Sequence, residues 1–135
     1  HVKTLSVFEY GTANLVNGAA GNRASATSNP EDMMVRSVSY KSDDTYAQGT
    51  KTSETYYDVH LGKGDEIADR SFNFTADGLH VKTLSVFEYG TANLVNGAAG
   101  NRASATSNPE DMMVRSVSYK SDDTYAQGTK TSETY

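Results

Sequence analysis

Four side chains near the middle of the chain are of types that bind a hard cation. Asp58 and His60 lie near the end of a predicted strand, and Asp65 and Glu66 follow the next turn. Carboxylates and turn carbonyls are the ligands that calcium prefers, so these four residues are the candidate metal ligands. Their spacing matches no calcium loop such as D-x-[DN]-x-[DN]-G, so a solvated hairpin tip explains them better than a calcium site. We therefore expect no dedicated metal site and no cofactor, with calcium as the one candidate.

No residue pattern in the chain indicates catalysis. Serine is abundant, but none lies in G-x-S-x-G, and no histidine is paired by motif with a nucleophile. The stretches GAAG and GKG are too short for a phosphate-binding loop. Two carboxylates brought together by the fold would suit glycoside hydrolysis, but nothing selects such a pair. We expect that the protein is not an enzyme and has no catalytic residues.

Two further features are candidates for modification or binding. Asn73 begins Asn-Phe-Thr, the acceptor pattern for N-glycosylation in secreted proteins. Alternation along a strand places it opposite Phe72 and Phe74, so we expect it to be exposed. Several tyrosines would suit an aromatic surface for a sugar or a partner, although core and cross-strand packing are the commoner roles in a sheet. These are Tyr10, Tyr40, Tyr46, Tyr56 and Tyr57.

The chain contains one long sequence twice. Residues 80–135 repeat residues 1–56 without a change, and residues 57–79 separate the copies. The repeating unit is therefore 79 residues long, near the lower end of sizes that fold alone. We interpret residues 1–56 as a partial repeat, completed by 57–79 or by a neighbouring repeat or chain. Residues 57–135 are then a complete unit in shifted register.

The clearest strand prediction covers residues 52–61, where residue types alternate with a period of two. Such alternation is typical of a half-buried strand. The predicted apolar face carries Thr55, Tyr57, Val59 and Leu61, and the polar face carries Glu54, Tyr56, Asp58 and His60.

Turn sequences at 62–66 and 76–78 separate this strand from predicted strands at 67–75 and 79–89. Residues 52–89 are therefore predicted to form an antiparallel meander.

Each copy also contains a first strand (2–10, repeated at 81–89), a loop (11–32 and 90–111) with a candidate short strand at ANLVN, a later strand (33–41 and 112–120) and a turn (42–51 and 121–130). The aspartate pairs at 43–44 and 122–123 are interpreted as turn residues.

These elements predict an all-β fold of antiparallel, sandwich-like tandem repeats with a 79-residue period. The seam at Leu79–His80 falls at the start of a predicted strand, so strands are expected to straddle it. Strand 2–10 lacks the preceding partner that its copy at 81–89 has. An unpaired edge strand is a template for association unless it is covered, so we expect strand exchange between adjacent repeats or identical chains.

Composition narrows the classes of partner. The net charge of −5, with acidic and basic residues interspersed, argues against nucleic acid. No stretch is long and apolar enough for membrane insertion. The chain contains no cysteine, so no disulfide or thiolate metal site is expected. Because it does not begin with Met, we expect it to be part of a longer polypeptide.

The duplication has three possible origins: a window from a natural tandem array, an engineered copy of the first 56 residues, and one fold that uses both copies asymmetrically. The seam carries no flexible bridge, which favours the array. The leading functional hypothesis is an extracellular or cell-surface structural protein that forms a stalk or filament with an adhesive or matrix role. The alternative is a carbohydrate-binding module with two equivalent sites, which bind a glycan or another surface ligand.

Overall fold

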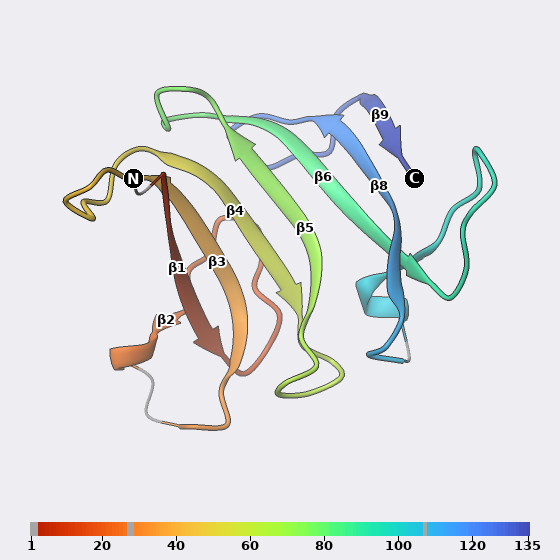
Figure 1. The fold of residues 1–135 in the computed structure, drawn as a ribbon, viewed down its shortest axis with the longest axis horizontal. Helices are drawn as coiled ribbons and strands as arrows, with labels where there is room; N and C mark the ends of the chain where they lie inside the picture. The colour runs from red at the N-terminus through yellow and green to blue at the C-terminus, as the bar shows by residue number, and fades with distance from the viewer. Residues whose placement is uncertain (1–2, 27–28, 107) are drawn as a thin grey trace.

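The computed structural model describes residues 3–26, 29–106 and 108–135, and their regular structure is almost entirely β-strand (Figure 1). The strands are β1 (Thr4–Gly11), β2 (Asn22–Arg23), β3 (Met33–Lys41), β4 (Lys51–Asp58), β5 (Ile67–Phe74), β6 (Val81–Gly90), β7 (Asn101–Arg102), β8 (Met112–Lys120) and β9 (Lys130–Thr134). Two short 3-10 turns, η1 (Ala24–Ala26) and η2 (Ala103–Ala105), follow β2 and β7. The predicted all-β class and antiparallel pairing are confirmed. In the described parts of the chain, no helix is long and apolar enough to cross a membrane.

The nine strands of the described residues belong to one sheet, in the order β2-β1-β3-β4-β5-β6-β8-β9, with β7 also paired to β6. The first copy supplies β1 to β3 and most of β4, and the second copy supplies β6 to β9. β5 comes from the segment between them and pairs with β4 on one side and β6 on the other. The predicted meander is confirmed, and it joins the two copies edge to edge.

The copy boundaries lie differently from the prediction. Leu79 and His80 lie in the connection between β5 and β6, not in a strand, because the turn at Asp77 and Gly78 extends to them. The Asp77 carboxylate accepts the Leu79 N–H at 3.0 Å, and Gly78 has a φ of 73°. The first copy ends at Tyr56, which lies inside β4, so a strand straddles that boundary instead.

Two other predicted strands differ from those in the structure. The candidate strand ANLVN is a loop, and the short pairing to β1 is made by β2. The predicted first strand begins at Thr4, while His1 and Val2 lie outside the described residues.

The sandwich-like arrangement is wrong for the described residues, which form one sheet and not two. A physical reason lies on the sheet face opposite Phe72, where small hydroxyl side chains stand opposite one another on successive strands. These are Ser37, Thr55, Ser71, Ser85, Ser118 and Ser132. The Thr55 and Ser71 hydroxyls lie 3.1 Å apart. A second sheet packs by burying apolar side chains, and this row offers few.

The predicted polarity of the two faces of β4 is also wrong. Glu54, Tyr56 and Asp58 are buried, whereas Thr55 and Tyr57 on the opposite face are only half-buried. Charged and hydroxyl groups can occupy a buried face when hydrogen-bonding partners surround them. Those partners come from other strands and loops and are described below.

The hydrophobic core lies over β5, where the two copies meet. Its buried members are Tyr56, Phe72, Val81, Leu84 and Val86. The Phe72 ring packs edge-on against two tyrosines, with centroid distances of 5.8 Å to Tyr56 and 4.7 Å to Tyr125. Tyr125 comes from the β8–β9 loop, and Leu15 from the loop after β1 covers the same cluster. Both copies therefore contribute to one core.

Two tyrosines at the same position in the two copies show how location in the sheet decides burial. Tyr46 and Tyr125 occupy equivalent turns, and both have a φ of 61°. Tyr125 packs on Phe72 and is half-buried, but Tyr46 remains 74% exposed. The turn conformation is therefore set locally, and the burial of the ring is set by β5.

This pair supports a matched test of the core. We expect Tyr125→Ala to lower the free energy of unfolding by about 2 kcal/mol, because it removes a half-buried aromatic ring. Tyr46→Ala, at an exposed position with the same backbone, should change it by less than about 0.5 kcal/mol. Urea denaturation of both variants measures the difference. Equal losses would contradict the assignment of the core to the junction.

Candidate functional site at the junction of the two copies

The Glu54 carboxylate is the most buried charge at the junction, with a side chain only 1% exposed. It accepts hydrogen bonds from Lys51 Nζ at 2.6 Å and from the hydroxyls of Tyr56 at 2.9 Å and Tyr125 at 3.1 Å. Burial raises its pKa, but the hydrogen bonds from Lys51 and Tyr56 and the charges of Lys51 and Arg36 outweigh burial and hold the pKa below its ordinary value. Glu54 is therefore ionised, and donors from both copies hold its charge.

Two arginines continue this network on either side of the Tyr56 ring. Arg36 Nε lies 2.8 Å from Glu9 Oε1, and its Nη1 lies 3.6 Å from Glu54. Arg70 stacks over Tyr56, with its guanidinium carbon 4.5 Å from the ring centroid. Stacking of a guanidinium on an aromatic face is favourable, more so where water is excluded. Glu9, Arg36, Tyr56 and Arg70 stand opposite one another across four strands.

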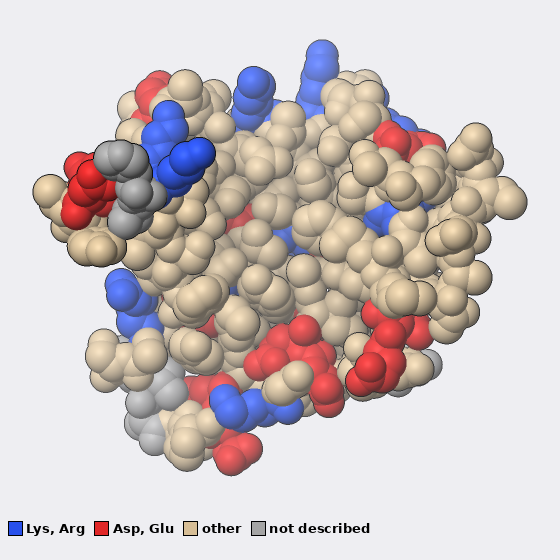
Figure 2. Space-filling model, viewed as in Figure 1, with Lys and Arg blue, Asp and Glu red and all other residues tan. Residues whose placement is uncertain are grey.

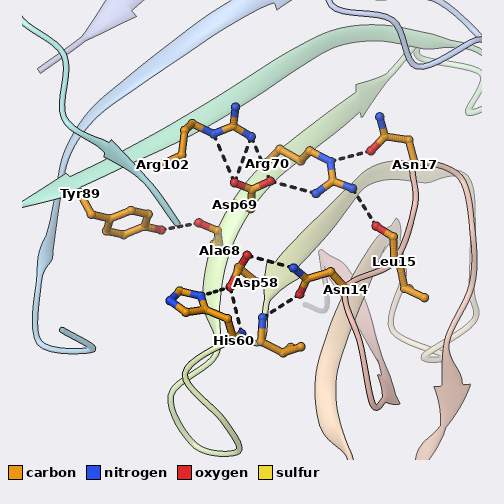
Figure 3. Close-up of polar contacts among 11 residues, drawn as sticks. Asn14, Leu15, Asn17, Asp58, His60, Ala68, Asp69, Arg70, Tyr89 and Arg102 are labelled. Atoms are coloured by element: carbon orange, nitrogen blue, oxygen red, sulfur yellow. Dashed lines mark hydrogen bonds and ion pairs between the residues drawn. The ribbon is translucent and has the colours of Figure 1, made fainter. Parts of the chain in front are cut away.

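The loop after β1 is tied to β5 by the other groups of Arg70 (Figure 3). Arg70 donates to Asn17 Oδ1 at 2.6 Å and to the Leu15 carbonyl at 3.0 Å. It also donates to Asp69 Oδ2 at 2.9 Å. Arg102 Nη2 of the second copy in turn donates to both carboxylate oxygens of Asp69, each at 3.0 Å. One aspartate–arginine cluster thus connects both copies to β5.

A second connection runs through Asp58 and His60 (Figure 3). Asn14 donates to Asp58 Oδ2 at 3.0 Å, and the Val59 N–H donates to Asn14 Oδ1 at 2.8 Å. His60 Nδ1 is hydrogen-bonded to Asp58, and His60 Nε2 lies 2.7 Å from the Thr106 carbonyl of the second copy. Both ring nitrogens face oxygen acceptors, so the Asp58 hydrogen bond and then the Thr106 carbonyl raise the pKa of His60.

A pocket of about 500 Å³ opens beside these connections. Its walls come from both copies and from β5: Val16, Asn17, Asp69, Arg70, Leu84, Val86, Arg102, Tyr125 and Gln127. Amide, guanidinium and phenol groups on a partly apolar wall can hydrogen-bond a small polar ligand. Because β5 is part of the wall, the pocket is a feature of the junction and not one of two equivalent sites.

The four metal-ligand candidates do not form one cluster. Asp58 is engaged by Asn14 and His60, and Glu66 accepts the N–H groups of Met34 at 3.0 Å and Gly64 at 2.9 Å. Asp65 is exposed on the β4–β5 turn. Within the described ranges, no group of three or more histidine, aspartate or glutamate side chains is arranged to hold a metal ion. Asp58, His60 and Glu66 therefore have roles in holding the strands and loops together.

The other candidates are spread over the sheet. Asn73 is half-buried and donates to Thr83 Oγ1 at 3.1 Å, so its amide serves cross-strand pairing, and its glycosylation stays a prediction. Tyr56 is in the core and Tyr46 is exposed, whereas Tyr10, Tyr40 and Tyr57 are half-buried. The five tyrosines therefore form no common aromatic surface.

The turn role predicted for the aspartate pairs is confirmed for Asp43 and Asp122. Asp43 and Asp122 each accept the N–H of the residue two positions later at 2.9 Å. Asp123 accepts the Val81 N–H at 2.9 Å, which fixes the start of β6.

Comparison with known protein families, curated proteins and solved structures gives no match. Sequence reasoning missed the main residues of the junction, Glu54, Arg36, Asp69, Arg70 and Arg102. A usable signal was present, because Glu54 and Arg70 alternate in step with Tyr56 and Phe72 on neighbouring predicted strands.

Glu54 and its copy Glu133 give a matched test of the buried charge. Glu54→Ala should lower the free energy of unfolding by about 3 kcal/mol, because it leaves buried Arg36 without one of its carboxylates. Glu133 also pairs with a buried arginine, Arg115, but its own side chain is 24% exposed and its contacts with Lys130 and Tyr135 are exposed, so Glu133→Ala should cost clearly less than Glu54→Ala. Chemical denaturation compares them, with Glu54→Gln as the variant to use if Glu54→Ala does not fold. A larger loss for Glu133→Ala would contradict this account.

The raised pKa of His60 predicts a pH-dependent contribution to stability. Protonated His60 favours the folded state, so its contribution is complete below the ordinary pKa of 6.5 and disappears as the pH rises through the raised value. The difference in Tm between the protein and His60→Gln should therefore shrink between pH 5.5 and pH 9. Thermal unfolding across this range, where Asp58 stays ionised, measures it. A difference that is constant or grows with pH would refute the role given to the imidazolium.

Proposed function

We propose that the protein is a structural module of a stalk or filament, in which successive 79-residue units extend one antiparallel sheet. The observation that carries the proposal is the position of β5, which pairs along both edges and joins one copy to the next. In this proposal, residues 1–56 are a partial unit and residues 57–135 are a complete unit in shifted register. The protein acts by length and repetition, without catalysis.

The strand order supports growth in one direction. The series β1-β3-β4-β5 is followed by β6-β8-β9, which are the copies of the first three strands. A further unit would therefore continue the series with a copy of β5. Since neighbouring strands lie about 4.8 Å apart, each 79-residue unit would add four strands and about 19 Å of length. The right-handed twist between strands would make the result a twisted ribbon.

An adhesive or matrix role is part of this proposal, in an extracellular or cell-surface setting. The row of hydroxyl side chains on one face runs across both copies, so added units would lengthen it and repeat the same contacts. Repetition of weak contacts raises total affinity through multivalency. In the view of Figure 2, charged side chains stand in small, separate groups between wide uncharged areas. A surface of this kind suits many weak polar contacts.

Chains lengthened by one or two further 79-residue units test the proposal. Small-angle X-ray scattering should show the maximum dimension increasing by about 19 Å with each unit. Separately folded globular units would instead add about 30 Å each, the diameter expected for 79 residues. A control chain with Ser71→Pro in each joining strand should lose the regular increment, because proline removes a ladder hydrogen bond. Increments of about 30 Å, or a compact particle, would reject the proposal.

A further inference from the structure

The two outer edges of the sheet carry the same residues that contact β5 in its centre. Along β6, residues 83–86 pair with β5 on one side and with β8 on the other. The identical strand β1 pairs with β3, but its other side meets only the two-residue strand β2, at Glu9 and Tyr10. In the part of the chain that the structure describes, the edge Thr4–Val7 therefore lacks the neighbour that its copy has.

Side chains around β1 are exposed where their copies are covered. Ala24 is exposed, whereas its copy Ala103 is fully buried beside β5. Arg23 is exposed, and its copy Arg102 is also partly exposed, at 44% of its side chain, but Arg102 is hydrogen-bonded to Asp69 of β5. Tyr46 shows the same contrast with Tyr125, as described above. The first copy thus presents the surface that receives β5, without a β5 strand on it.

The opposite edge of the sheet, at β9, shows the matching contrast with its copy β4. Tyr135 is 47% exposed, whereas its copy Tyr56 is fully buried beneath Arg70 and Phe72. Met113 is 53% exposed, whereas its copy Met34 is half-buried and donates its N–H to Glu66 in the β4–β5 turn. This edge presents the surface that β4 offers to β5.

We infer that the free edges of β1 and β9 are the two halves of the β5 binding groove, and that each receives the strand Ile67–Phe74 of another copy of the unit. The inference deepens the proposed function and rests on it, because it names the contact by which units join. The occupant is identified by sequence identity: the same surfaces, in the same chain, are seen holding this strand. Main-chain pairing supplies affinity in such strand addition, and side-chain pockets supply specificity.

The contacts expected at each edge follow from the filled copy. At β1, an incoming strand would place its Phe72 against Tyr46 and its Asp69 beside Arg23, as in the pairs with Tyr125 and Arg102. At β9, its Arg70 would stack on the Tyr135 ring, as it does on Tyr56. One strand with both sets of contacts can therefore bridge two chains.

A peptide of residues 57–79 added to the intact chain is the direct probe. Bridging predicts that particle mass, followed by light scattering, rises to a maximum near one peptide per chain and falls again when excess peptide fills both edges separately. Amide exchange measured by NMR should slow at Thr4–Val7 and at Lys130–Thr134. The same peptide with Phe72→Ala should bind at least tenfold more weakly.

A chain with the joining strand fused to it tests the same contact without depending on how tightly a free peptide binds. Residues 57–79 are placed directly before His1, which recreates the junction Leu79–His80 and holds the strand at high effective concentration. The amides of Thr4–Val7 should then exchange as slowly as those of Thr83–Val86. Tyr46→Ala, neutral in the present chain, should become as destabilising as Tyr125→Ala.

Fast exchange at Thr4–Val7 in the fused chain, with Tyr46→Ala still neutral, would overturn the inference. The proposed function fails separately. If the edge accepts the strand but longer chains do not extend by the predicted increment, the contact is real and the filament is not. If longer chains extend while the β1 edge stays open, units join by another contact.

Discussion

Two hydrogen-bond ladders on a single strand hold this structure together. β5 pairs with β4 on one edge and β6 on the other, so its backbone groups are satisfied only when both copies are present. The core over Phe72 and the charge network around Glu54 both depend on this alignment. Each needs a ring or hydroxyl of Tyr125, which reaches β5 only because β6 and its neighbours are paired to it. Backbone pairing thus comes first, and side-chain packing follows from it.

The duplication separates local from long-range effects within one molecule. Identical segments adopt the same strands, the same bulge positions and the same left-handed turn conformation at Tyr46 and Tyr125. Their burial differs, because burial depends on what lies beyond the segment. Glu54 is enclosed by donors from two copies, while Glu133 at the outer edge keeps the donors of its own copy and remains partly exposed. Position in the sheet, and not sequence, makes the difference.

Most strands could be predicted from the sequence, since period-two alternation and the glycine turns at Gly62 and Gly78 are local signals. The buried face of β4 could not, because polarity alone places Glu54 outside. Its burial depends on Arg36 and Tyr125, which are far away in the sequence. The single sheet was also missed, because the hydroxyl row on the face opposite Phe72 becomes a row only when strands from both copies stand side by side.

Residue-resolved amide exchange on the unmodified chain tests most directly whether β5 is what completes each copy. NMR can distinguish the two copies even though their sequences are identical, because their environments differ. If β5 completes each copy, the amides of Thr83–Val86 that face β5 should exchange much more slowly than the identical amides of Thr4–Val7, and exchange should be slowest of all within β5. Equal protection of the two copies would contradict this role of β5.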